Sequence, residues 1–571
     1  MAVSGTRTPP SEQPESAASD GARVRTSGHW IDPDDDPLHG WLSSVDGRCS
    51  SSGVLILPPI GYPYWSAYRT GRVIAERVAA AGHLAFRLDY RSSGDSSGDQ
   101  WDAELVASWG KSIARAAREL RRLGCTRLTL VGIQLGGTLA LLGAEALEAD
   151  TVVAWAPVVS GRRYAREIRA RSVEVPRDAL PPGIEEAMVL AGTVFTTETL
   201  GDLATLEATK LPSRPARRTL LVDGVVPTPL LERLTSLGAE VDHREIAGGE
   251  SALEWPAEDA VVPTAVVHAI CSWIGEADRD SRLLPPETVT ARIAWGGSAV
   301  AERVVELGAA RLVAILTEPV ESEALADDPA TVVFLNSGGE QHTGPGRAWV
   351  EYARGLALRG HRCLRVDYRG WGESPDDGHA PGRLYAPHCE RDTVEIVRAL
   401  QQLGFEHVVL VGLCHSAWMA LRAVLTEPAD GVVALNPQMY WRQGDPVEAL
   451  ITDTRTRRTN ERLRHRRGAR VGLWTALDIA GHRPWGARWL DELSGGETPI
   501  AMLFAEGDDG IDFLRTRLDR RLRHAVRSGR IRVVEIPEID HAMHRTWLRP
   551  KLVDILDEQI RLLTAAADAQ S

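Results

Sequence analysis

The stretch Val408–Ala420 reads VVLVGLCHSAWMA, and the earlier stretch Leu128–Ala140 reads LTLVGIQLGGTLA. Each has an apolar run of strand type, a glycine, a residue flanked by small side chains, and a helix-forming run. This layout predicts a strand that turns sharply into a helix and presents one side chain above a sheet. Small residues are needed because the turn is strained and the helix packs close to the strand. The presented residue is Cys414 in the later stretch, which can act as a nucleophile, and Gln134 in the earlier one, which cannot.

Further motifs occur twice, in the same order, around these two stretches. LDYRSSGDS (Leu88–Ser96) matches VDYRGWGES (Val366–Ser374), and LLVDGVV (Leu220–Val226) parallels MLFAEGDDGI (Met502–Ile511). Repeats of about 250 residues are too long for a solenoid. The sequence therefore predicts a tandem duplication of a whole domain.

Short apolar runs alternate with amphipathic helical runs through both halves. The expected strands are Val54–Leu57, Leu84–Leu88, Leu128–Val131, Val152–Trp155 and Leu220–Val222, and then Val332–Leu335, Cys363–Val366, Val408–Val411, Val432–Leu435 and Ile500–Phe504. Continuous apolar strands separated by helices predict a mostly parallel sheet covered on both faces. Each half is therefore expected to be an α/β domain.

The 571 residues exceed what one core usually supports. We expect a disordered leader over residues 1–27, a first domain over 28–280 and a second over 281–571, because the pattern breaks near Asp278–Pro286. The second domain should open with a strand-rich segment, Thr288–Thr317, that one short helix interrupts. Inserted lids are expected over about 160–215 and 440–498.

Composition excludes several classes of function. The net charge of −13 argues against nonspecific nucleic-acid binding. No window approaches the run of about 20 apolar residues that a membrane helix needs. The six cysteines show no paired or metal-type spacing and no export signal precedes them, so reduced thiols in the cytoplasm are expected. No phosphate loop or ligand cluster implies a cofactor or a metal.

In the second half the turn with Cys414, the EGDDG motif and an Asp-His pair follow one another. These residues resemble the α/β-hydrolase fold, whose order is nucleophile, acid, base, and the resemblance covers nearly all of both halves. It implies Cys414 as the nucleophile, His541 as the base and Asp508 as the acid, with Asp509 as a rival. One departure is Ser416, where glycine is usual.

The resemblance also implies an oxyanion hole made of two backbone amides. One belongs to His415, and the other to the loop NSGGEQHTGPGR (Asn336–Arg347), with Gly339 as the favoured donor. This loop, followed by VDYRGWGES, is similar to small hydrolases found beside bacterial polysaccharide and secondary-metabolite clusters.

The first half offers Gln134, Val225 or Val226, and Ser251 where the nucleophile, the acid and the base would stand. Loss of all three groups with retention of the scaffold indicates a pseudoenzyme that braces the active half or shapes its entrance. A rebuilt site that uses other residues is the alternative.

The second lid contains RTRRTNERLRHRRGAR (Arg455–Arg470). Arg455, Arg458 and Arg462 form either a solvated basic face or a dock for an anionic partner, such as an acidic substrate or a carrier protein with its phosphopantetheine arm. Trp441, in the same lid, either lines an apolar acyl pocket or packs the lid.

The sequence thus predicts a cysteine-dependent acyl enzyme, a hydrolase or acyltransferase of the thioesterase and esterase class in secondary metabolism. Its donor would be a small-molecule ester or thioester, free or bound to a carrier protein. The alternatives are a lactone or dienelactone-type hydrolase, and a noncatalytic binding or scaffold protein. The acyl donor, the acceptor and the oligomeric state stay open.

Overall fold

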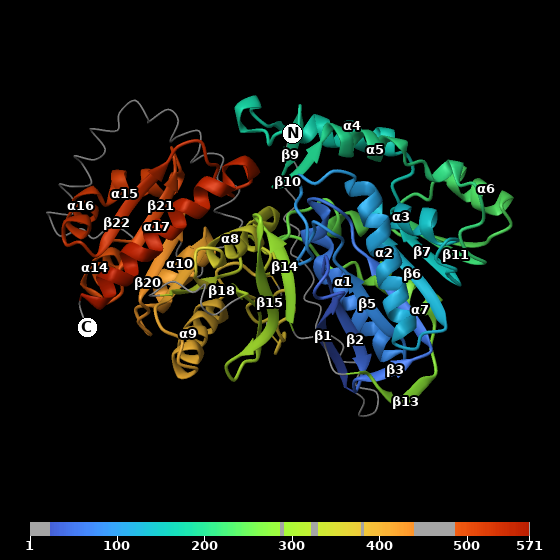
Figure 1. Ribbon diagram of the computed structural model, residues 1–571, viewed down its shortest axis with the longest axis horizontal. Coiled ribbons are helices and arrows are strands. Elements are labelled where there is room, and N and C mark those ends of the chain that lie inside the picture. The colour runs from blue at the N-terminus through green and yellow to red at the C-terminus, as the bar shows by residue number, and fades with distance from the viewer. Residues whose placement is uncertain (1–22, 286–289, 321–328, 379–381, 439–485, 570–571) are drawn as a thin grey trace, which may run out of the picture.

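The computed structural model describes residues 23–285, 290–320, 329–378, 382–438 and 486–569. Two β-sheets, each covered by helices, lie side by side, with the first half at the right of Figure 1 and the second at the left. None of the described helices is both long and apolar enough to cross a membrane.

The first sheet has eight strands in the order β1-β2-β5-β4-β6-β7-β11-β12. Their bounds are β1 Val24–Ile31, β2 Leu38–Val45, β4 Ser52–Leu57, β5 Leu84–Leu88, β6 Arg127–Ile133, β7 Thr151–Trp155, β11 Arg218–Asp223 and β12 Glu240–Glu245. The first three strands in this order pair antiparallel, and the remaining pairs are parallel.

The second sheet has nine strands in the order β14-β15-β16-β18-β17-β19-β20-β21-β22. Their bounds are β14 Thr290–Trp295, β15 Ser298–Leu307, β16 Leu312–Pro319, β17 Thr331–Phe334, β18 Arg362–Val366, β19 Val408–Leu413, β20 Gly431–Leu435, β21 Ile500–Ala505 and β22 Ile531–Ile536. From β15 onward this sheet repeats the order and the strand directions of the first, and β14 adds an edge strand. All ten expected strands are confirmed.

Helices cover both faces of each sheet. In the first half they are α1 Pro63–Ala80, α2 Leu105–Arg122, α3 Leu135–Gly143, α4 Gly161–Arg171, α5 Thr197–Thr205, α6 Thr228–Ser236 and α7 Thr264–Ile274. In the second half they are α8 Ala348–Ala357, α9 Pro387–Gln402, α10 His415–Ala423, α14 Ala487–Gly495, α15 Asp509–Arg517, α16 Asp519–Arg527 and α17 Arg549–Asp568. Alternate side chains of the central strands reach opposite faces, since Ile56 packs with α1 and α7 while Leu55 packs with α2 and α3. The fold is therefore the α/β-hydrolase fold, three layers deep in each half.

The inserted segment of the first half lies between β7 and β11. It contains α4, α5 and a small sheet of β8 (Val173–Glu174), β9 (Ala187–Leu190) and β10 (Thr193–Thr196). Most of the lid expected over 440–498 lies outside the described residues, and the described part contains α14.

Three expectations about segment boundaries need correction. Residues 24–27 of the expected disordered leader over residues 1–27 are strand instead, because Val24–Ser27 belongs to β1 and pairs with β2. The boundary expected at 280 falls inside β13 (Arg279–Leu283), which pairs with β3 (Arg48–Ser50) and so belongs to the first half. No helix interrupts the described residues 290–317; the turn at Gly296-Gly297, where both φ values are positive, joins β14 directly to β15.

Reciprocal ion pairs join the two halves. Arg87 of β5 lies 2.7 Å from Glu373, and Arg365 of β18 pairs with Asp95. Arg87 and Arg365 occupy matching positions in the two repeats, as do Asp95 and Glu373. The same exchange of partners occurs at a two-fold interface between identical subunits.

Backbone contacts and an apolar cluster also join the two halves. Arg72 donates to the carbonyl of Gly372 over 2.6 Å, and Arg347 donates to the carbonyl of Gly94 over 2.8 Å. An apolar cluster at the interface combines side chains of both halves, namely Trp30, Ala291, Ile293, Val300 and Ala357.

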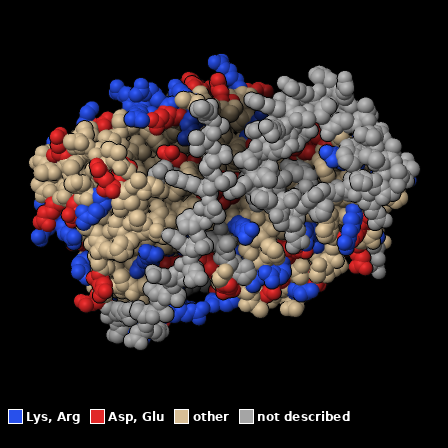
Figure 2. Space-filling model, turned by 180° about the vertical axis from the view of Figure 1, so that it is seen from behind, with Lys and Arg blue, Asp and Glu red and all other residues tan. Residues whose placement is uncertain are grey.

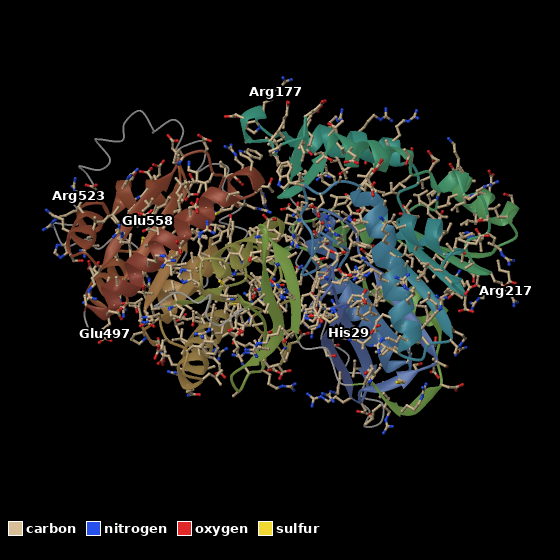
Figure 3. The ribbon with its side chains drawn as sticks, in the orientation of Figure 1. His29, Arg177, Arg217, Glu497, Arg523 and Glu558 are labelled. Carbon is tan, nitrogen blue, oxygen red and sulfur yellow. The ribbon has the colours of Figure 1, made fainter. Side chains whose placement is uncertain are left out.

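In Figure 3, Arg177, Arg217 and Arg523 project outward at the rim, whereas His29 lies inside, 2.7 Å from Glu119.

Candidate active site

Cys414 lies at the sharp turn between β19 and α10, with φ 57° and ψ −111°. Gln134 occupies the equivalent turn between β6 and α3, with φ 51° and ψ −116°. A non-glycine residue at positive φ is strained, and such strain is typical of the turn that presents a nucleophile. Cys414 is partly exposed. Both halves therefore have the same presenting turn, and only the second places a thiol there.

Small residues and one serine hold this turn together. A Cβ on Gly412 would collide with the backbone of Ser416. Ser416 Oγ accepts a hydrogen bond from the N–H of Leu413 (3.0 Å) and donates one to the carbonyl of Leu413 (3.1 Å). The serine that stands in place of the usual glycine therefore adds hydrogen bonds to the turn.

His541, which follows β22, connects Cys414 with an aspartate. Its Nδ1 lies 2.6 Å from Asp508 Oδ2, and Asp508 Oδ1 accepts a hydrogen bond from the N–H of Gly510 at the start of α15 (2.8 Å). Burial lowers the pKa of His541, but hydrogen bonds to Asp508 and Cys414 outweigh burial and raise it to about 10. The imidazole is therefore protonated at neutral pH and contacts both partners.

Asp509, the rival acid, and His544, a second histidine close to His541 in the sequence, lie apart from this chain of contacts. Asp509 is exposed, and no hydrogen bond or ion pair joins it to His541 in the part of the chain that the structure describes. His544 Nδ1 lies 3.9 Å from Asp540 Oδ2, and burial lowers the pKa of His544. The geometry favours Asp508 and His541 for the acid and the base.

Asn436 is a residue of the site that the sequence analysis missed. It follows β20 with φ 44° and is fully buried. Its Nδ2 donates to the carbonyl of His541 (2.8 Å), and its Oδ1 accepts from the N–H of Ala505 (2.7 Å). Asn436 thereby ties the histidine loop to the end of β21. The signal was available, because asparagine tolerates positive φ and follows an apolar strand where the first half has Ala156.

The two expected oxyanion donors come directly after two neighbouring strands. His415 follows Cys414 after β19, and the loop Asn336–Arg347 follows β17. Since β17 and β19 are adjacent and parallel, the loop Asn336–Arg347 and Cys414 lie at the same edge of the sheet. Gly339 has φ 80°, and a Cβ there would collide with the backbone nitrogen of Glu258 in the first half. The first half thus packs directly on this loop.

The side chain of His415 is fully buried. Its ring stacks on Trp371 with a centroid distance of 5.4 Å and meets the edge of Tyr385 at 5.7 Å. Burial lowers the pKa of His415 to about 3. This imidazole is therefore neutral, in contrast to that of His541.

Four of the other five cysteines lie in environments that suppress thiolate formation. Burial raises the pKa of Cys125 to about 12 and that of Cys271 to about 11. Burial raises the thiol pKa of Cys363 and Cys389 as well. Among these four, Cys271 is partly exposed and makes a suitable control for Cys414.

The equivalent positions of the first half contain no acid, base or thiol. Ser251 is exposed and donates to the carbonyl of Gly248 (2.8 Å). Val225 is exposed and Val226 is buried. Gln134 Oε1 is buried and has no hydrogen-bond partner among the described residues.

The predicted lid residues Arg455, Arg458, Arg462 and Trp441 lie outside the described residues. The described surface carries both signs of charge. On the face shown in Figure 2, acidic and basic side chains are interspersed. The described residues on that face form no continuous basic patch of the kind that binds nucleic acid nonspecifically.

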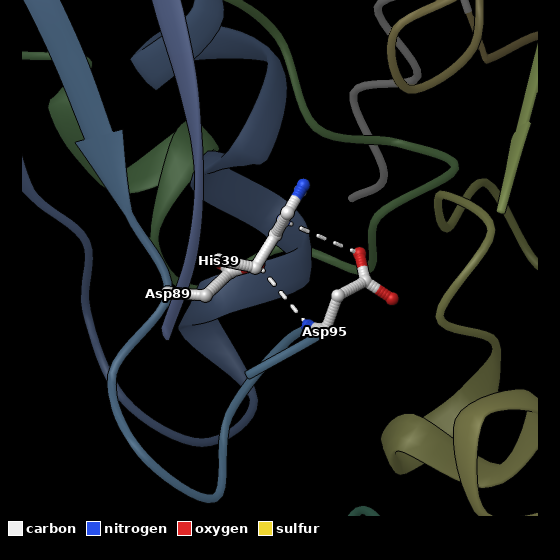
Figure 4. A group of neighbouring side chains, drawn as sticks. All are labelled: His39, Asp89 and Asp95. Carbon is white, nitrogen blue, oxygen red and sulfur yellow. Dashed lines mark hydrogen bonds and ion pairs between the residues drawn. The ribbon is translucent and has the colours of Figure 1, made fainter. Parts of the chain in front are cut away.

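A buried cluster of His39, Asp89 and Asp95 has ligand atoms close enough to hold a metal ion (Figure 4). His39 Nδ1 lies 3.4 Å from Asp89 and 3.7 Å from Asp95. Asp95 also pairs with two cationic side chains of the second half, Arg365 and His342. Since these side chains already neutralise Asp95, we treat the cluster as part of the interface.

Residues 332–553 match the family model described as "Alpha/beta hydrolase family". No curated protein matches the chain. Est1E from Butyrivibrio proteoclasticus, solved with bound ferulic acid, is 15% identical, with a TM-score of 0.34 over 43% of this chain and 97% of that one. Brefeldin A esterase, described as a bacterial homologue of human hormone-sensitive lipase, is 18% identical, with a TM-score of 0.31 over 47% and 77%. A serine hydrolase from Xanthomonas campestris, described as lacking a lid, is 14% identical, with a TM-score of 0.28 over 46% and 94%.

Proposed function

We propose that the chain is a cysteine-dependent acyl-enzyme catalyst that cleaves or transfers an acyl group from an ester or a thioester. The observation that carries this proposal is the contact chain from Cys414 through His541 to Asp508, with Cys414 at a strained presenting turn. The thiolate is the nucleophilic form of a thiol, and a protonated imidazole beside it balances its charge.

The reaction follows from these positions. Cys414 Sγ attacks the acyl carbon, and His541 gives its proton to the departing alkoxide or thiolate, which leaves a thioester on the enzyme. Water, an alcohol or an amine then attacks this thioester while His541 takes up a proton. The products are the acid or the transferred acyl group, with the free enzyme restored. Asp508 keeps the imidazole oriented and stabilises its charge.

The negative oxygen of each tetrahedral intermediate needs hydrogen-bond donors that are already in place. We assign this role to the backbone amide of His415 and to one from the loop Asn336–Arg347, with Gly339 as the favoured donor. Support comes from the shared sheet edge of β17 and β19.

We propose that the first half is a pseudoenzyme that arose by duplication and retains no acyl chemistry. Its support is the equal strand order of the two sheets and the presence of Gln134 at the equivalent turn. In this scheme the first domain extends to Leu283, because β13 pairs with β3. A carrier-bound donor that docks on the arginines around Arg458 stays a proposal that rests on the sequence alone.

Turnover of a panel of acyl thioesters and activated esters tests this function, with Cys414→Ala and Cys271→Ala beside the parent. We expect Cys414→Ala to lose turnover and Cys271→Ala to retain it. Added alcohols or amines separate transfer from hydrolysis by the products formed. Turnover of lactones in preference to esters would favour the lactonase alternative.

Absence of turnover from every donor would overturn the proposal if Cys414 is also alkylated no faster than the other five cysteines. The noncatalytic scaffold would then be the better account.

A further inference from the structure

One aspartate of Val366–Ser374 organises the loop Asn336–Arg347. Asp367 Oδ1 accepts hydrogen bonds from Asn336 Nδ2 (2.9 Å) and from the N–H of His342 (2.7 Å). Asp367 Oδ2 lies 2.7 Å from His342 Nδ1. Asn336 Nδ2 also donates to the carbonyl of Glu340 (3.0 Å). The segment that contains Gly339 is therefore closed at both ends onto Asp367.

The first half completes this arrangement with a carboxylate of its own. The other ring nitrogen of His342, Nε2, lies 2.7 Å from Asp95 Oδ2. The side chains of Asp95, His342 and Asp367 are at most 1% exposed. A chain of carboxylate, imidazole and carboxylate thus crosses the interface, and both ring nitrogens of His342 can donate. Figure 4 shows Asp95 in its position beside His39.

The charges of Asp95, His342 and Asp367 explain why these three side chains are stable when buried. Burial lowers the pKa of His342, but Asp367 and Asp95 outweigh burial and raise it to about 10. Burial alone would raise the pKa of Asp95, yet Arg365 and His342 hold it well below its usual range. His342 is therefore a buried cation between two anions, with little freedom to leave either one.

The reciprocal interface contact has no such bridge. Glu373, which matches Asp95 in sequence position, accepts hydrogen bonds from Arg87 and from Tyr68 Oη (2.8 Å). Neither of these donors belongs to a loop that follows a central strand of the first half. The interface is thus reciprocal in its arginine–carboxylate pairs and one-sided in its imidazole bridge. The bridge serves only the half that contains Cys414.

We propose that Asp95 of the first half is a positioning residue for the oxyanion loop of the second half and acts through His342. This inference rests on the function proposed above. The site is then a composite of both halves, since the first half supplies a side chain on which the geometry of the loop depends. The packing of Gly339 against Glu258 adds a second contact from the first half to the same loop.

Comparison of two reactions at one thiol tests this proposal. Alkylation of Cys414 by iodoacetamide is a displacement at carbon that develops no oxyanion, whereas acylation by a thioester does. In Asp95→Asn we expect the acylation rate to fall tenfold to a hundredfold, with kcat reduced and KM little changed. The alkylation rate of Cys414 should stay within twofold of the parent.

Two further variants complete the design. Glu373→Gln removes the matching interface carboxylate and serves as the control, with acylation and alkylation both close to the parent. His342→Gln should reproduce the selective loss of acylation, and it replaces Asp95→Asn if that variant does not fold. An unchanged acylation rate in a folded Asp95→Asn or His342→Gln would overturn the proposal. A parallel fall in alkylation would overturn it too.

Hydrogen exchange separates this inference from the proposed function. If the parent is never acylated, the proposed function fails. A positioning role of Asp95 still predicts faster exchange at the amides of residues 338–344 in Asp95→Asn than in Glu373→Gln. Equal exchange in the two variants would overturn that positioning role.

Discussion

Two histidines beside Cys414 have opposite protonation states, and their partners explain why. His415 is fully buried and His541 is partly buried, and loss of water disfavours the charged form of either ring. His541 meets the carboxylate of Asp508, and its pKa rises to about 10 despite burial. The ring nitrogens of His415 have no hydrogen-bond partner among the described residues, and burial lowers its pKa to about 3. Of these two rings, the protonated one is thus the ring that pairs with Asp508.

Asp508 is the carboxylate on which this charge depends. In Asp508→Asn we expect turnover to fall about 10²–10⁴-fold, because the amide neither stabilises the imidazolium nor fixes its orientation. Alkylation of Cys414 at pH 7 should slow as well, since the ring beside the thiol then carries less positive charge. Steady-state kinetics and thiol labelling measure the two effects.

Asp509→Asn is the matched control, one residue along and exposed. It should leave turnover within about threefold of the parent, because the structure joins His541 to Asp508. A larger loss in Asp509→Asn than in Asp508→Asn would exchange the roles of the two aspartates.

Because His342 is protonated in the fold, the folded protein should lose stability as the pH becomes alkaline. Its pKa is about 10 in the fold, whereas an unfolded histidine releases its proton near pH 6.5. The stabilisation is therefore complete below about pH 6.5 and is lost as the pH rises through about 10. Between pH 7 and 10 the Tm of the parent should decline more than that of His342→Gln. His541 is present in both proteins, so its contribution cancels, and equal declines would contradict the buried cation.

Among the elements, the turn after β20 determines where the histidine loop lies. Asn436→Ala removes the hydrogen bonds to His541 and Ala505, and we expect kcat to fall at least about tenfold. Alanine fits the backbone there, since Ala156 has φ 46° at the matching turn of the first half. Steady-state kinetics with a Tm measurement distinguishes misplacement from unfolding. An unchanged kcat would remove Asn436 from the site.

The central elements could be predicted because burial on both faces makes β4 and β19 continuous apolar runs. The antiparallel strands at the edge were harder. β1 begins within the Ser- and Pro-rich leader, and β13 within DRDSRLLPPE, because both strands are held by pairing with a distant strand. Tertiary pairing overrides local propensity in such segments.

At the scale of the whole molecule, the contacts between the two halves could not be predicted from the sequence. Asp95 and His342 are 247 positions apart, and each reads as a polar residue of a glycine-rich loop. The likeness of the motifs LDYRSSGDS and VDYRGWGES was visible in the sequence. That these two motifs face each other, with Arg87 and Arg365 exchanging partners, follows only from the packing of the two sheets.

Separate expression of the two halves tests whether the site is a composite of both. Residues 1–284 and 285–571, co-expressed as two chains, should purify together, because the reciprocal ion pairs and the shared apolar cluster re-form. The second half alone lacks Asp95, so we expect acylation at least about tenfold slower than in the complex. A second half that is monomeric and as active as the full chain would contradict the composite site.

Intact-protein mass spectrometry tests the central claim most directly. The parent, Cys414→Ala and Cys271→Ala are each exposed to acyl thioesters and activated esters, then digested to locate any adduct. We predict an acyl adduct on Cys414 in the parent and in Cys271→Ala, with the mass of the donated group, and none in Cys414→Ala. An adduct that persists in Cys414→Ala, or a parent that forms none with any donor, would contradict the acyl-enzyme account.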